Sequence, residues 1–140
     1  MAAVALAAGL AQTNVGHPLL RGAGLYEEPE SYTALAFTSP QSLPTRLSSH
    51  PTSVRMSFAI SNASADPRSY HWSIELKRTG HAYRLATGEV EVPAGNRVSV
   101  AKIVKASCVD GQARMTVQVA APTESIDFLM ACSSQKEEKR

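Results

Sequence analysis

The sequence predicts an all-β fold in which seven to eight short antiparallel strands form a sandwich between residues 31 and 132. Apolar and polar residues alternate along most of this stretch, which is the pattern of strands with one buried face. Gly, Pro, Asn and Asp interrupt the alternation at short intervals and mark turns. No segment between the strands shows the period of an amphipathic helix, and strands joined without crossover helices must be antiparallel.

The alternation is clearest in residues 54–60, where every second side chain is apolar. Residues 38–52 are rich in Ser and Pro and are expected to form a loop. Gly88 interrupts the apolar pattern of residues 81–92, so that stretch predicts one or two strands. The expected strands cover residues 31–37, 54–60, 70–76, 81–92, 98–104, 115–119 and 126–130, and the turns fall at 62–67, 79–80, 93–96, 110–111 and 121–124.

The number of strands points to a known class of sandwich. Seven strands in about 100 residues is the size of immunoglobulin and fibronectin domains. Trp72 lies at an inward position of the expected third strand, as a core tryptophan of such a sandwich does. The chain has 140 residues, which suits one domain, and its 44% hydrophobic and 19% charged residues are typical of a globular protein.

The two cysteines, Cys108 and Cys132, are expected to form a disulfide. Cys132 continues the inward positions of the last strand, and Cys108 precedes the strand that pairs with it across the 121–124 turn. Such a bridge would staple the last hairpin, and closing its loop would contribute roughly 3.5 kcal/mol of stability. A disulfide indicates an oxidising compartment, whereas the alternative is two buried free thiols in a cytosolic protein.

Residues 1–11 form an uncharged apolar run that is too short to span a bilayer. Three interpretations are open: a signal peptide without a positive n-region, the outer end of a transmembrane helix that starts upstream, or a short Ala-rich helix. The first two place residues 12 onward outside the cytoplasm. Residues 12–30 are expected to form a linker, and residues 133–140 a disordered polar tail.

No catalytic, cofactor-binding or metal-binding pattern is recognised. The histidines lack the short paired spacing of zinc ligands, and only His71 and His81 are expected to approach each other, across neighbouring strands. No Gly-x-Ser-x-Gly pattern marks a nucleophilic serine. The remaining candidate site residues have simpler interpretations. Glu27, Glu28 and Glu30 are expected to be solvated charges of the linker, and His17 and His50 ordinary surface histidines. We therefore expect no enzyme, no cofactor and no metal.

Three further features have a structural and a functional interpretation. Asn62 begins a glycosylation sequon, but we expect it to end its strand by bonding to the turn backbone. Asp127 lies on the outward face of the last strand. Its structural interpretation is a paired or edge-protecting charge, and its functional interpretation is a contact with a partner. Tyr70, Trp72 and Tyr83 would form a sugar-stacking platform if exposed, but the alternation places the first two in the core.

Three stretches resemble a bacterial pattern. The resemblance is to cell-adhesion-related immunoglobulin-like domains. It lies in a strand that ends in Asn (54–62), a second strand (70–76) and a strand closed by Pro-Ala-Gly (90–95). They are also similar to extracytoplasmic domains of actinobacterial membrane proteins of unknown function, where a segment like 123–132 ends the domain and an upstream cysteine precedes the preceding strand. The resemblance covers residues 31–132 and implies a sandwich exposed outside the membrane, without catalytic residues.

The expected function is a secreted or membrane-anchored, non-catalytic module in adhesion or cell-envelope assembly. Its partner would be an unknown protein or polysaccharide of the envelope, and a membrane tether through the N-terminus is possible. The net charge is +2 and the basic residues are scattered, so nucleic acid is not expected. The alternative is a carbohydrate-binding accessory domain of an envelope polysaccharide system, which a buried Trp72 would count against.

Overall fold

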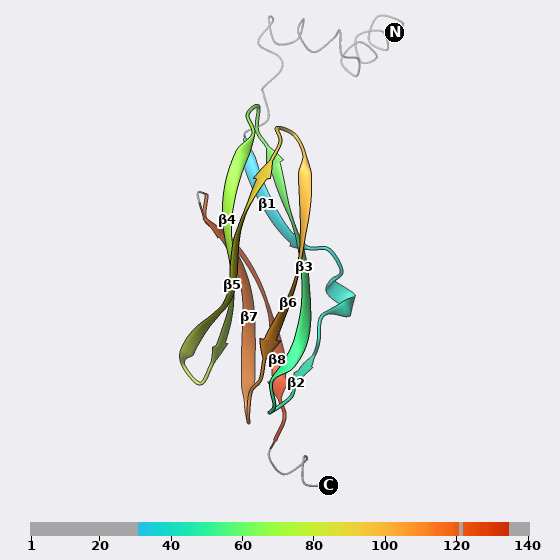
Figure 1. Ribbon diagram of the computed structural model, residues 1–140, viewed down its shortest axis with the longest axis vertical. Coiled ribbons are helices and arrows are strands. Elements are labelled where there is room, and N and C mark those ends of the chain that lie inside the picture. Colours follow the sequence, from blue (N-terminus) through green and yellow to red (C-terminus); the bar gives the residue numbers. More distant parts are fainter. Residues whose placement is uncertain (1–30, 121, 135–140) are drawn as a thin grey trace, which may run out of the picture. The chain divides into compact units, whose positions relative to one another are not determined.

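Two β-sheets pack face to face in the computed structural model, which describes residues 31–120 and 122–134 (Figure 1). The prediction of an all-β sandwich is confirmed. The elements are β1 (Tyr32–Phe37), η1 (Pro40–Ser42), β2 (Arg46–Leu47), β3 (Thr52–Ala63), β4 (Arg68–Arg78), β5 (His81–Val92), β6 (Arg97–Ala106), β7 (Gln112–Ala120) and β8 (Glu124–Cys132).

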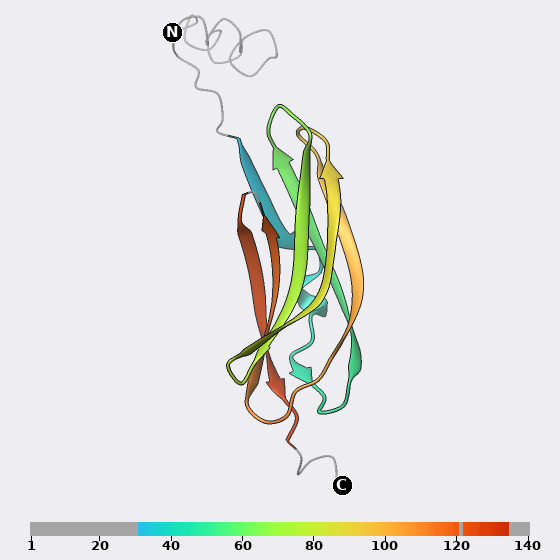
Figure 2. The same cartoon turned by 60° about the vertical axis from the view of Figure 1, so that its left-hand side comes forward.

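One sheet has three strands in the order β1-β3-β6, and the other has five in the order β2-β8-β7-β4-β5. All neighbouring strands are antiparallel except β2, which runs parallel to β8. The two sheets meet along two sides, where β1 lies beside β8 and β5 lies beside β6 (Figure 2). β6 and β5 are therefore edge strands whose outer edges pair with no described strand.

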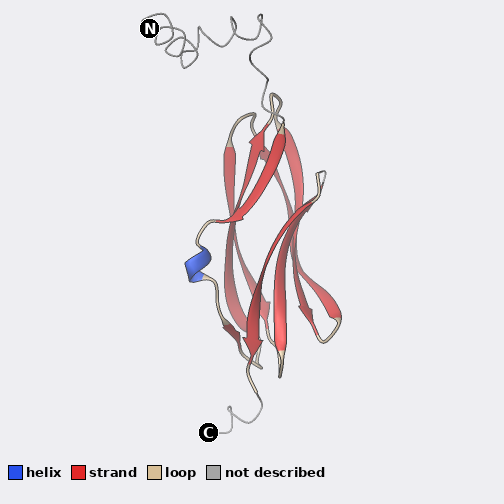
Figure 3. Cartoon of the chain, turned by 180° about the vertical axis from the view of Figure 1, so that it is seen from behind, coloured by secondary structure: helices blue, strands red, loops and turns tan. Residues whose placement is uncertain are grey.

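The chain changes sheet between β1 and β2, and the short 3-10 helix η1 lies on this crossing (Figure 3). The sequence predicted only a loop here. β2 has two residues, which is too short for an alternating pattern, and Pro44 and Pro51 flank it. Leu47 is nevertheless buried, so β2 contributes a side chain to the core.

The core lies between the sheets and is formed by alternate residues of the central strands. The predicted inward positions of β3, β4 and β7 are confirmed, because these side chains are all buried: Val54, Met56, Phe58, Ile60, Tyr70, Trp72, Ile74, Leu76, Met115, Val117 and Val119. Burial of apolar side chains at this density stabilises the sandwich at roughly 1.5–3 kcal/mol for each large residue.

Gly88 makes room for the core tryptophan. Trp72 packs edge-to-face on Phe58, with ring centroids 5.5 Å apart, and its indole covers the opposite residue, Gly88. A Cβ atom at position 88 would lie 2.2 Å from the indole ring. The possible strand break at Gly88 does not occur, since β5 is continuous there and the register shift falls opposite Ile74 and Glu75.

The expectations for residues 1–30 and for most of the polar tail fall outside the described residues. Within the described part of the chain, no helix is long and apolar enough to cross a membrane.

Candidate functional site

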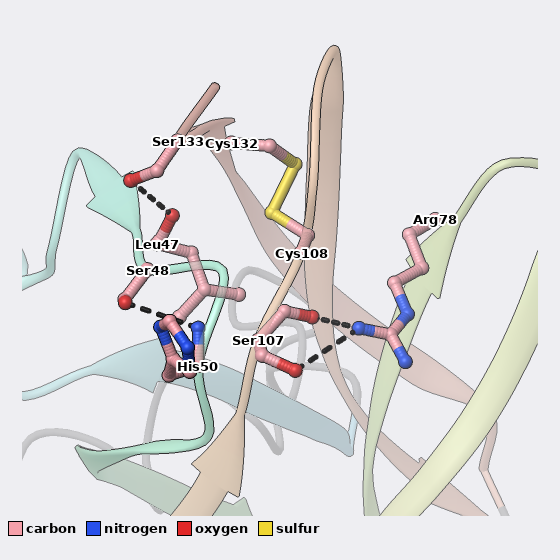
Figure 4. The surroundings of a disulfide bond; sticks show 8 residues. All are labelled: Leu47, Ser48, His50, Arg78, Ser107, Cys108, Cys132 and Ser133. Carbon is pink, nitrogen blue, oxygen red and sulfur yellow. Dashed lines mark hydrogen bonds between the residues drawn. A yellow bond between two sulfur atoms is a disulfide. The ribbon is translucent and has the colours of Figure 1, made fainter. Parts of the chain in front are cut away.

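The predicted disulfide joins Cys108 to Cys132, with Cα atoms 5.2 Å apart, a usual separation for such a bridge (Figure 4). Cys108 follows the end of β6, and Cys132 ends β8. The bridge closes the β7–β8 hairpin where Gln112 pairs with Ala131, as predicted.

The disulfide also connects segments beyond that hairpin. The Cys108 amide donates to the carbonyl of Ser48 at 2.9 Å, and Leu47 pairs with Cys132. Because β6 belongs to the three-stranded sheet and β2 and β8 to the five-stranded sheet, the bridge ties the two sheets together at this end. Its role in the fold is therefore larger than that of a hairpin staple.

Arg78 reinforces the same end of the sandwich. Its guanidinium donates to the carbonyl oxygen of Ser107 and, at 3.3 Å, to the Ser107 hydroxyl (Figure 4). The guanidinium also lies 4.8 Å from the centre of the Tyr83 ring. Arg78 thus connects the β4–β5 hairpin to the segment that carries Cys108, and its guanidinium occupies one face of Tyr83.

The aromatic residues considered as a sugar platform do not form one. Tyr70 is fully buried and shares a hydrogen bond of 2.9 Å with Thr33, while Trp72 is 5% exposed. The prediction that both residues face the core is confirmed. The exposed tyrosines lie on different sheets, since Tyr32 belongs to β1 and Tyr83 to β5.

The remaining single-residue candidates have structural roles. The buried Asn62 lies within β3, and its side-chain amide donates to the carbonyls of Asp66 at 2.8 Å and Val92 at 3.0 Å. Glycosylation would require breaking both bonds, so the predicted bonding to the turn explains this residue. Asp127 accepts a hydrogen bond of 2.6 Å from Arg114 on β7, which makes it a paired surface charge.

The expectation that His71 and His81 approach each other is wrong. His71 pairs with Glu89 and His81 pairs with Arg78, because the β4–β5 hairpin turns at Thr79 and Gly80 and separates the two histidines along its length. In the described part of the chain, no group of three or more His, Cys, Asp or Glu residues is arranged to hold a metal ion.

The outer face of the five-stranded sheet carries a shallow polar groove of about 570 Å³. Its lining includes the small or hydroxyl residues Ser73, Thr87 and Ala120, together with longer polar side chains. One of these is His71, whose ring lies 3.8 Å from the Glu89 carboxylate. Such a groove offers hydrogen-bonding groups to a polar ligand but no exposed Phe, Tyr or Trp ring.

Comparisons with known proteins support the fold. No protein-family model matches the sequence, and no curated protein is significantly similar to it. The CARDB domain of a Pyrococcus furiosus protein, solved in complex with di-metal ions, is similar with a TM-score of 0.51 and 10% identity, over 77% of this chain and 91% of that chain. The chain therefore has an immunoglobulin-like β-sandwich fold.

Two β-glucosidases contain a similar sandwich. The enzyme from Listeria innocua gives a TM-score of 0.54 at 18% identity over 76% of this chain. The enzyme from Erythrobacter marinus gives 0.52 at 12% identity over 78% of this chain. This chain spans only 17% of the length of either enzyme. At such identities the similarity establishes the fold alone.

Proposed function

We propose that the chain is a non-catalytic β-sandwich module that acts outside the cytoplasm, in adhesion or in assembly of the cell envelope. The observation that carries this proposal is the Cys108–Cys132 disulfide. Disulfides form and persist in oxidising compartments and are rare in the cytosol. Cys108 is 1% exposed and its bridge connects β2, β6 and β8, so the disulfide is a built-in part of the packing at this end.

The polar pairs of the five-stranded sheet support a binding or structural role rather than catalysis. An active site brings a nucleophile, a base and an orienting group together in a pocket. The pairs Glu75–Arg84 and Arg114–Asp127 instead lie across neighbouring strands on an exposed face. The immunoglobulin-like fold match supports the same role by analogy.

A carbohydrate-binding accessory role is the second candidate. The polar groove of about 570 Å³ on the five-stranded sheet favours it, since sugars are recognised through many hydrogen bonds. The buried Trp72 counts against it, because sugar rings stack on exposed aromatic side chains.

Thiol trapping in native cells tests the extracytoplasmic proposal. Cells that produce the full chain are lysed in denaturant with excess N-ethylmaleimide, and the chain is weighed by mass spectrometry before and after reduction and a second maleimide treatment. We expect no maleimide adduct before reduction and two adducts after it. Two adducts before reduction, together with recovery from the cytosolic fraction, would contradict the proposal.

A further inference from the structure

The three-stranded sheet carries four basic side chains and no acidic one: Arg55, Arg97, Lys102 and Lys105. Lys102 lies on the inner face of β6, opposite Met56, and its ammonium group is 5.7 Å from the centre of the Trp72 ring. The other three residues form no ion pair with any residue that the structure describes. Every acidic residue of the described strands lies on the five-stranded sheet, so folding separates the charges into a cationic and a mixed sheet.

Small side chains separate the cations on the outer face of this sheet. The cross-strand pairs of β3 and β6 on this face are Ser61–Arg97, Ala59–Ser99, Ser57–Ala101, Arg55–Ile103 and Ser53–Lys105. The cations therefore stand at the two ends of a floor of Ser and Ala. A ligand lying on this floor would meet a positive charge at each end.

At the first end, Tyr32 and Arg97 line a hollow of about 510 Å³, together with Ser61 and Asn96. Tyr32 is 59% exposed, so its ring is accessible to a ligand. An aromatic ring offers an apolar surface on which a sugar ring can stack. A guanidinium beside it offers paired donors to a carboxylate or phosphate. This end thus combines the two contacts that an acidic sugar requires.

At the second end, Arg55 stands beside the cross-strand pair of Ser53 and Lys105. Arg55 also lines a hollow of about 300 Å³ that η1 helps to form, with the hydroxyl residues Ser39 and Ser42. Two exposed cations and several hydroxyls in one place form a site for an anionic, hydroxyl-rich ligand.

We propose that the outer face of the three-stranded sheet binds an acidic polysaccharide, bearing carboxylate or phosphate groups, whose chain runs along β6. Arg97 and Lys105 lie near the two ends of β6, roughly 26 Å apart at about 3.3 Å per strand residue. A ligand that contacts both ends is therefore a polymer rather than a single sugar. This inference rests on the proposed function and names the class of its partner.

Protection of an edge strand against aggregation does not explain the whole charge pattern. Lysines on an edge strand discourage pairing with other chains, and this protection is sufficient to explain the presence of Lys102 and Lys105 on β6. Arg55, however, lies on the central strand β3, which has neighbours on both sides and needs no protection. The same arginine points to the outer face, where a ligand would lie.

Other anionic partners fit this face less well. Membrane-binding surfaces insert several apolar or aromatic side chains, whereas Ile103 is the one large aliphatic side chain on β6 exposed on this face. Single-stranded nucleic acid stacks successive bases on several aromatic rings, and Tyr32 is the only aromatic residue of β1, β3 or β6 that is exposed.

Binding of the full chain to hexagalacturonate and to a phosphorylated maltohexaose tests the proposal, with neutral maltohexaose as the comparison. Isothermal titration calorimetry at several NaCl concentrations should show binding to at least one acidic glycan that weakens with salt. Lys105→Glu should weaken that binding at least about tenfold, and Tyr32→Ala at least about threefold. Near-ultraviolet circular dichroism of each variant verifies that the sandwich is folded.

Matched controls use equivalent residues of the other sheet. Lys77→Glu changes the net charge by the same amount on β4, and Tyr83→Ala removes the exposed tyrosine of β5. Both should leave binding within about twofold. Equal losses in Lys105→Glu and Lys77→Glu would overturn the proposal, because net charge alone would then explain binding.

Two further outcomes would also overturn it: no binding of either acidic glycan, or tighter binding to phosphatidylglycerol vesicles or to a thymidine oligonucleotide. Neither outcome bears on the thiol state of Cys108 and Cys132 in native cells. Failure of this inference is therefore distinguishable from failure of the proposed function.

Discussion

The inner faces of the two sheets are alike, whereas their outer faces differ. Both inner faces consist of alternating apolar residues that fill a single core. The outer face of the five-stranded sheet carries charges of both signs, and some of them pair across strands. The outer face of the three-stranded sheet carries Ser, Ala and unpaired cations. Folding requires the apolar inner faces but does not require the outer faces to differ. We therefore attribute the difference between the outer faces to function.

The five-stranded sheet pairs some of its charges across neighbouring strands. Glu75 accepts a hydrogen bond of 3.2 Å from Arg84, and Asp127 accepts one of 2.6 Å from Arg114. Exposed pairs of this kind stabilise a protein only slightly, but they lower the attraction of a surface for charged partners. The cations of the three-stranded sheet have no such neighbours among the described residues, so they are available to an external anion.

The disulfide ties the two sheets together at one end, and its removal should have the largest effect on stability. We expect Cys108→Ser/Cys132→Ser to lower the free energy of unfolding by about 2–5 kcal/mol. Guanidinium unfolding monitored by Trp72 fluorescence measures this. Reduced wild-type protein is the control and should show a similar loss. A loss below about 1 kcal/mol in both samples would mean that the bridge is dispensable.

The contact between Gly88 and Trp72 tests packing of the five-stranded sheet onto the core. Gly88→Ala should destabilise the fold by about 1–3 kcal/mol, because its Cβ atom would overlap the indole ring. The exposed neighbour Thr87→Ala is the matched control, and its effect should be within about 0.5 kcal/mol. The melting temperatures of the two variants measure this difference in stability. Equal values would contradict a close contact between position 88 and the Trp72 ring.

Asn62 connects the three-stranded sheet to the end of β5 through its bond to Val92, and to the β3–β4 turn through its bond to Asp66. Asn62→Ala should cost about 1–3 kcal/mol, because buried carbonyl groups lose their donor. Asn96→Ala, at an exposed turn position, should have a much smaller effect in the same urea titration. A similar cost for both variants would show that burial of the Asn62 amide is unimportant.

The surface pairs of the five-stranded sheet should have the smallest effect. A double-mutant cycle of Arg114→Ala and Asp127→Ala should give a coupling energy of about 0.2–1 kcal/mol that decreases with salt. A coupling above about 2 kcal/mol would contradict the description of this face as a solvated surface.

The sequence was sufficient to predict the strands whose inward and outward residues alternate between apolar and polar. Residues 54–60 and 70–76 place a large apolar side chain at every second position, on the buried face, and a polar or small one between them, so their period is visible locally. β2 could not be predicted, because its two residues are held by pairing with β8, far along the chain. The role of Gly88 depends on Trp72 from the neighbouring strand, which the pattern of a single strand does not contain.

The disulfide was predictable because one hairpin brings both cysteines together, but its contact with β2 was not. The cationic face was also hidden in the sequence. Arg55 is separated from Lys105 by the whole β4–β5 hairpin, and only the pairing of β3 with β6 brings them side by side. Scattered basic residues in a sequence therefore do not exclude a charged surface in the fold.

Mapping of ligand contacts by residue decides whether the two outer faces differ in function. Backbone amide signals of the ¹⁵N-labelled chain are followed by nuclear magnetic resonance during titration with hexagalacturonate and with phosphorylated maltohexaose. We predict that the largest shifts occur in β1, β3 and β6, around Tyr32, Arg55 and Arg97. The largest shifts in the groove of β4, β5 and β7, around Ser73 and Gln118, would contradict this prediction.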